Sequence, residues 1–146
     1  MNPQPADPLA FEWGHLQRSF SAYERDALAI KLAAVAMFLV ALVLSLDMTV
    51  TGGLLAVMWV QEAVWRAFQA RVAARIARVE TLLASGAAAP PCQLHSEFAA
   101  TRRGVAGTLL EYVSQLPRPA VAFPHVVLLA LNFLLTVDAA GGGSPV

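Results

Sequence analysis

An apolar stretch at residues 32–46 constrains the fold of this chain most, because it contains no charged side chain and no polar stripe at helical spacing. A helix on the surface of a soluble domain needs such a stripe to face water. The stretch extends back to about residue 28 if the ammonium of Lys31 reaches the membrane interface. These residues predict a transmembrane helix over about 28–47.

Two further stretches are predicted to span. Residues 50–68 are apolar but interrupted by Gln61 and Glu62, and residues 119–138 are apolar apart from a few polar side chains. The composition agrees, because 58% of the residues are hydrophobic and 14% charged, whereas a soluble domain has roughly 45–50% and about 25%. The predicted fold is an all-α integral membrane protein with three transmembrane helices, whose helical cytoplasmic extensions form a three-helix bundle.

The basic residues predict the orientation, because Lys and Arg in short loops stay on the cytoplasmic side. Arg18, Arg25 and Lys31 precede the apolar stretch at 32–46, and the remaining basic residues lie from Arg66 to Arg118. None falls in the expected hairpin at 47–53 or in the C-terminal tail. We therefore expect a cytoplasmic N-terminus and central segment and a periplasmic C-terminus. Abundant alanine, and arginine at all but one of the ten basic positions, favour a bacterial inner membrane.

Apolar residues spaced three and four apart continue each helix beyond the membrane on the cytoplasmic side. Two long antiparallel helices are therefore predicted on either side of a tight turn. A turn centred near residues 48–51 would place Phe20 beside Val79 and Glu24 level with Arg75. By the same count Tyr23 would meet Ile76, and Asp26 would lie close to Arg71.

The rest of the chain divides at proline and glycine. A single amphipathic helix is predicted to return along the second arm to the membrane. The predicted segments are a disordered N-terminus at 1–8, the helical hairpin at 9–85, a linker at 86–92, the cytoplasmic helix at 93–116, the third transmembrane helix at 119–138 and a flexible tail at 139–146.

Glu62 is the sharpest candidate for function, since a carboxylate within an apolar span costs on the order of 2.5–3.5 kcal/mol at the membrane centre. Arg66 follows it at i,i+4, and Lys31 on the partner helix is within reach, so a structural ion pair is expected. A role as a coupling carboxylate is the alternative. His125 and Asn132 share one face of the third span, where they are expected to bond across to a neighbouring helix. His125 lies at roughly the depth of Glu62.

Basic residues outside the spans suggest two contact surfaces. Arg71, Arg75 and Arg78 form a stripe that either attracts anionic headgroups or is a solvated face paired with carboxylates. Arg102 and Arg103 could form a small patch for a partner. The carboxylates expected to face the stripe are Glu24, Asp26 and Glu80.

No catalytic or cofactor motif is present in the sequence. Cys92 and His95 lack the second ligand pair of a zinc site, and a net charge of zero gives no reason to expect nucleic-acid binding. We expect a non-enzymatic accessory or scaffold protein without cofactors, in contact with lipids and with a membrane-protein partner or a second copy. The alternative is an oligomeric small transporter or channel that uses Glu62.

Overall fold

The computed structural model describes residues 8–86, 89–101 and 104–141, which form helices and no strand. The expected all-helical class is therefore confirmed. The helices are α1 (Pro8–Val43), α2 (Met48–Ser85), α3 (Leu94–Thr101), α4 (Gly104–Gln115) and α5 (Pro119–Gly141).

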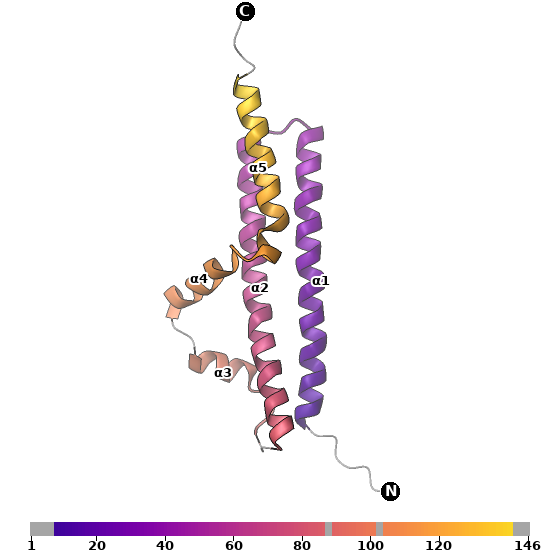
Figure 1. The fold of residues 1–146 in the computed structure, drawn as a ribbon, viewed down its shortest axis with the longest axis vertical. Coiled ribbons are helices and arrows are strands. Elements are labelled where there is room, and N and C mark those ends of the chain that lie inside the picture. The colour runs from indigo at the N-terminus through magenta and orange to yellow at the C-terminus, as the bar shows by residue number, and fades with distance from the viewer. Residues whose placement is uncertain (1–7, 87–88, 102–103, 142–146) are drawn as a thin grey trace, which may run out of the picture.

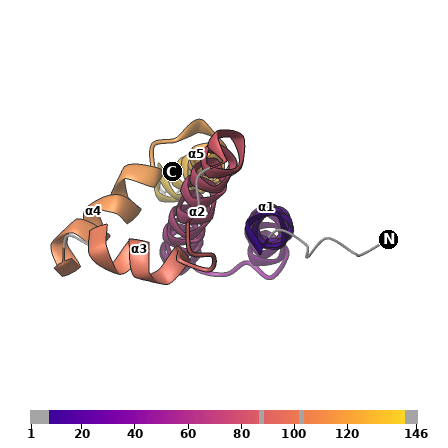
Figure 2. The same ribbon diagram turned by 90° about the horizontal axis from the view of Figure 1, so that it is seen from below.

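The long helices α1 and α2 lie antiparallel, and α5 packs along the N-terminal half of α2 (Figure 1). Viewed along the long axis, α3 and α4 lie on one side of α2 and α1 on the other (Figure 2). One end of the molecule is thus a bundle of α1, α2 and α5. The other end is the α1–α2 pair with α3 against it, so the expected three-helix bundle does not continue unchanged along the molecule.

The turn between α1 and α2 lies earlier than the sequence predicted. Helix α1 ends at Val43, and Asp47 caps α2 by accepting hydrogen bonds from the backbone N–H groups of Thr49 and Val50, at 2.8 and 3.1 Å. Asp is a strong N-cap residue because its carboxylate satisfies backbone donors that have no partner in the helix. The expected hairpin at 47–53 is therefore wrong, and both of its glycines lie inside α2.

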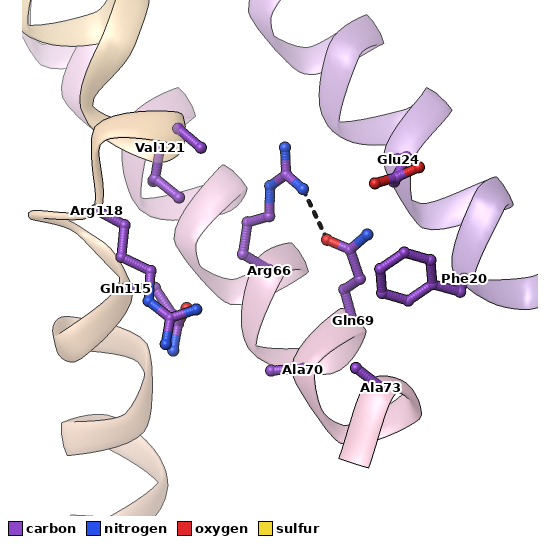
Figure 3. A pocket seen from close by; sticks show the side chains of 10 residues that line it. Phe20, Glu24, Arg66, Gln69, Ala70, Ala73, Gln115, Arg118 and Val121 are labelled. Atoms are coloured by element: carbon purple, nitrogen blue, oxygen red, sulfur yellow. Dashed lines mark hydrogen bonds between the residues drawn. The ribbon is translucent and has the colours of Figure 1, made fainter. Parts of the chain in front are cut away.

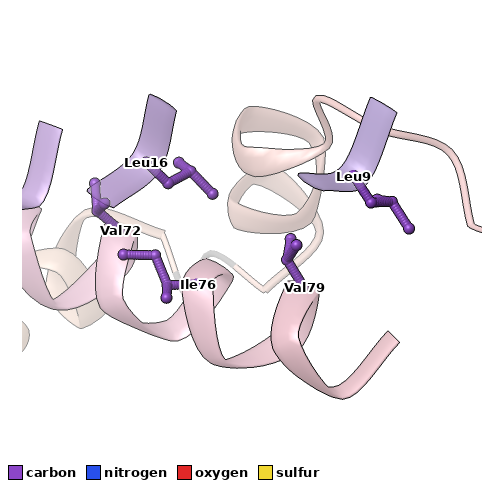
Figure 4. Packing of buried hydrophobic residues seen from close by; sticks show 5 residues of the cluster. All are labelled: Leu9, Leu16, Val72, Ile76 and Val79. Atoms are coloured by element: carbon purple, nitrogen blue, oxygen red, sulfur yellow. The ribbon is translucent and has the colours of Figure 1, made fainter. Parts of the chain in front are cut away.

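The earlier turn changes every contact along the two arms. Leu9 lies toward Val79, and Leu16 lies toward Val72 and Ile76 (Figure 4). The expected register was therefore wrong. Its charge pairs are not the ones formed, because Arg75 pairs with Glu12 and Glu97, and Arg71 pairs with Glu111.

Two shorter helices replace the single helix expected at 93–116. Gly104 has φ +69°, a left-handed conformation that glycine adopts without steric cost and that an α-helix does not contain. Helices α3 and α4 are consequently inclined to each other on one side of α2, and both contact α2 (Figure 1). The prediction failed because Gly104 sits inside an otherwise regular apolar pattern.

Of the described helices, α1 and α5 are long and apolar enough to cross a membrane. The expected third span at 50–68 is not among them, because α2 carries Gln61, Glu62 and Arg66 close together. Helix α5 has a kink at Phe123, whose backbone angles are not helical. Phe123 precedes Pro124, and a residue before a proline is disfavoured in the helical conformation.

The boundaries at the chain ends and in the linker differ slightly from those expected. Helix α5 extends to Gly141, so residues 139–141 do not belong to a tail. Residues 89–92 are not helical. Gly86 ends α2 with φ +64°. The predicted disorder at 1–7 and the predicted tail at 142–146 lie outside the described residues.

Candidate functional site

The carboxylate of Glu62 lies where three helices meet. Its side chain is fully buried, with Oε1 at 3.2 Å from Nζ of Lys31 on α1 and 3.7 Å from Nε of Arg66 on α2. Its Oε2 is 3.5 Å from Nδ1 of His125 on α5. Both cations named from the sequence are thus in contact with Glu62, and His125 is at the same depth. Two cations thus face one buried carboxylate, as the sequence predicted, and a purely structural role for this ion pair stays a prediction.

Small residues allow the helices to come close at this cluster. On α1, Ala27 and Ala34 are fully buried and lie on the same helical face as Lys31, and on α2 Ala63 and Ala67 are almost fully buried. A methyl side chain keeps the interhelical distance short. Lys31 can therefore reach across to Glu62 and can also donate a hydrogen bond to the carbonyl of Ala120 in the first turn of α5.

His125 completes the contact between α5 and α2. The ring is fully buried and its Nδ1 lies 3.2 Å from the carbonyl oxygen of Val121, while Nε2 has no hydrogen-bond partner among the described residues. The arrangement fixes the rotation of α5 relative to Glu62. A coupling role for Glu62 stays a prediction.

Asn132 makes the second polar contact between α5 and α2. Its Nδ2 donates to the carbonyl oxygen of Met48 at 3.0 Å, which is a bond across to a neighbouring helix as the sequence predicted. Gly52 lies opposite, and a Cβ at that position would be 2.9 Å from the same Nδ2 atom. Gly52 therefore serves the close approach of α5 rather than the turn.

Arg75 is the centre of a second ion-pair cluster, at the other end of the molecule. Its Nε and Nη2 donate to the two carboxylate oxygens of Glu12 at 2.9 and 3.0 Å, and its Nη1 donates to Glu97 at 2.8 Å. Only 3% of Arg75 is exposed. The hydrogen bond from the Arg75 guanidinium, more than any other contact, holds the pKa of Glu12 below its usual value. Glu12 also accepts a hydrogen bond from the backbone N–H of Cys92, at 2.9 Å.

Arg71 attaches α4 and α3 to α2. It donates from Nε and Nη2 to both carboxylate oxygens of Glu111, at 3.1 and 3.0 Å. Its guanidinium carbon lies 3.9 Å from the ring centroid of Phe98 and 4.8 Å from that of Phe68. Such stacking on aromatic faces is a common arginine geometry.

The arginine stripe is therefore used mainly inside the molecule. Arg71 and Arg75 are paired, and Arg78 is 65% exposed with its Nε at 3.2 Å from Glu97. Of the expected partners, Glu80 instead accepts a hydrogen bond from the indole of Trp13 at 3.0 Å. The prediction of a solvated stripe paired with Glu24, Asp26 and Glu80 was wrong in its partners, and wrong in its exposure for Arg71 and Arg75. The patch at Arg102 and Arg103 lies outside the described residues.

Sequence reasoning missed Glu12, Glu97 and Glu111 as partners of the stripe. A turn placed before Asp47 would have moved the register toward the observed pairing of Glu12 with Arg75. Glu97 and Glu111 could not have been identified from the sequence as partners of the stripe, because their positions depend on the break at Gly104.

No protein-family model, curated protein or solved structure matches this chain. What the chain does is therefore inferred from its own residues.

Proposed function

We propose that this protein is a small accessory or scaffold protein of a bacterial inner membrane, which binds a partner membrane protein by helix packing and has no catalytic role. In this proposal α1 and α5 cross the membrane, and the N-terminal half of α2 crosses between them. The part of α5 that follows the break at Phe123, residues 124–141, has 18 residues, or about 27 Å at 1.5 Å per residue, which is close to a hydrocarbon layer of about 30 Å.

The burial of polar groups supports a membrane path for α2. Glu62 is fully buried against Lys31 and His125, so it does not face lipid, and large apolar side chains such as Val57 and Val60 are exposed on the same helix. A helix with internal polar groups can cross a membrane when neighbouring helices satisfy them. In this proposal, α1 and α5 shield the polar side chains of α2 from lipid, so that α2 can cross the membrane although its mean hydropathy is low.

The exposed apolar face of α4 is the observation that carries the partner proposal. Val105, Leu109 and Val113 recur every four residues and form one stripe, and Leu110 lies beside it. These side chains are 57–70% exposed, although α4 lies outside the proposed spans. The opposite face is already in use, because Glu111 pairs with Arg71. An exposed apolar stripe on an amphipathic helix is typical of helix-in-groove recognition.

Site-specific crosslinking tests the proposal. A photoreactive residue at Leu109 should give one discrete crosslinked membrane protein in native membranes, and Val113→Glu should abolish that product. Ser114 is exposed outside the stripe, so a photoreactive residue there should give little product and Ser114→Glu should leave the Leu109 product intact. Crosslinks only to lipid, or only between two differently tagged copies of this chain, would refute the proposal that α4 binds a different membrane protein.

A further inference from the structure

A cavity lined by both apolar and polar side chains opens next to the Glu62 cluster, at the junction of α1, α2, α4 and α5. Its volume is about 320 Å³, at the lower end of the roughly 300–1,000 Å³ of small-ligand sites. Figure 3 shows Phe20 and Glu24 on the α1 side and Gln115 and Arg118 on the opposite side, with Arg66 between them. Side chains from distant parts of the sequence thus converge on one space.

Two guanidinium groups supply hydrogen-bond donors to this cavity. Arg118 lies between α4 and α5 and makes no side-chain hydrogen bond or ion pair within the described part of the chain. Arg66 is held in place by the bond from its Nη1 to Oε1 of Gln69, at 2.7 Å, and by Glu62 behind it. The planar guanidinium group of arginine matches the geometry of phosphate oxygens, to which it can donate two parallel hydrogen bonds.

The cavity also contains acceptors, so it is not a simple anion site. Gln115 is only 4% exposed, and its Oε1 is buried without a hydrogen-bond partner among the described residues. A buried polar atom without a partner costs free energy, which a ligand donor would recover. The Glu24 carboxylate adds a negative charge across the cavity from Arg118 (Figure 3). Donors and acceptors together suit a group that carries both charges.

We propose that this cavity binds the phosphoethanolamine headgroup of a membrane phospholipid. Arg118 and Arg66 would hold the phosphate, while Glu24 and Oε1 of Gln115 would accept hydrogen bonds from the ammonium group. The site lies beside Ala120 and Val121 in the first turn of α5, so it is at the cytoplasmic edge of the proposed span, where headgroups are. The inference rests on the membrane placement given under the proposed function, and not on the partner at α4.

Lipid retention by the purified full chain tests the site. Native mass spectrometry in detergent should show more bound phosphatidylethanolamine than phosphatidylcholine or phosphatidylglycerol of the same acyl chains. Phosphatidylcholine lacks N–H donors and phosphatidylglycerol lacks the ammonium. Arg118→Gln should lower phosphatidylethanolamine binding about tenfold, the loss of one charged hydrogen bond. Glu24→Gln should remove the preference over phosphatidylcholine.

Matched variants separate the site from general surface charge. Arg25→Gln and Asp26→Asn change the same charges at exposed α1 residues that do not line the cavity, so they should leave binding unchanged. Thermal unfolding in the same detergent verifies that each variant is folded. Equal binding by Arg118→Gln and Arg25→Gln, or no preference among the lipids, would overturn the proposal.

A free ligand with the same chemistry is distinguished by competition. Soluble phosphoethanolamine or inorganic phosphate should displace the lipid only at a large excess. Displacement at equal concentration would assign the site to a free phosphorylated compound and refute the lipid. A chain that integrates into membranes but shows no lipid preference refutes this inference alone, whereas a chain that does not integrate refutes the membrane placement as well.

Discussion

Arg75 connects three helices through one buried guanidinium. It donates hydrogen bonds to both carboxylate oxygens of Glu12 on α1 and to one carboxylate oxygen of Glu97 on α3. A buried charge pair is a modest source of net stability, but breaking it leaves an uncompensated charge, which costs about 3–5 kcal/mol. The cluster therefore fixes which surfaces of α1, α2 and α3 meet.

Glu12 should make the stability of this end of the molecule depend on pH. Arg75 lowers the pKa of Glu12 in the folded protein. The ionised carboxylate therefore stabilises the fold fully when the pH is above the pKa of Glu12 in the unfolded chain, near 4.5. This stabilisation is lost as the pH falls through the pKa of Glu12 in the folded protein. We expect the unfolding free energy of the wild type to decrease on acidification more steeply than that of Glu12→Gln. Denaturation in mixed micelles across this range measures the difference.

Asp26→Asn is the matched control for that experiment. Asp26 is exposed and makes no ion pair or hydrogen bond among the described residues, so its variant should follow the wild-type pH profile. A Glu12→Gln profile as steep as the wild type would show that Arg75 does not stabilise the ionised carboxylate.

At the scale of the helices, the contact between α2 and α5 depends on a glycine. Gly52 faces Asn132, whose amide is fixed by its bond to the carbonyl of Met48. The neighbouring Gly53 has nothing within 4 Å of the place a Cβ would occupy. Two adjacent glycines in one helix therefore have different roles, which the sequence alone does not distinguish.

Alanine substitution at the two glycines should have opposite effects. Gly52→Ala would push the methyl group into Asn132 and should lower the unfolding free energy by about 1–3 kcal/mol. Gly53→Ala should raise it by up to about 1 kcal/mol, because alanine is the better helix former. Unfolding of both variants under one set of detergent conditions gives the comparison. A loss of similar size at both positions would contradict the close approach of α5.

At the scale of the whole molecule, the turn and the C-terminal end of α5 lie together at one end, and α3 lies toward the other (Figure 1). The basic residues follow this division, since none occurs in the turn or at the end of α5. A membrane across α1 and α5 would therefore separate the basic half from the half without basic residues.

The single cysteine allows this topology to be tested. Cys92 is exposed and lies near α3, so an impermeant maleimide should label it only after the cells are permeabilised. In a Cys92→Ser background, Ser45→Cys in the turn should be labelled in intact cells. Labelling of Cys92 in intact cells, with Ser45→Cys protected, would reverse the orientation.

The sequence alone determined the helical class, the existence of the long hairpin and the partners of Glu62. These features depend on the periodicity of apolar residues, and on side chains that are one helical turn apart or at the same depth along neighbouring helices. Each of these can be counted directly along the sequence. The sequence did not determine the position of the turn, because Asp47 and the two glycines at 52 and 53 all favour a break in a helix.

Tertiary structure decided the register of the arms, the division between α3 and α4, and the partners of Arg71 and Arg75. A shift of the turn moves every residue of one arm past the other, so a small local difference changes all distant pairs. The cavity beside Arg66 and the burial of Glu62 likewise exist only because separate helices pack together. Their chemistry comes from residues that are far apart in the chain and adjacent only after folding.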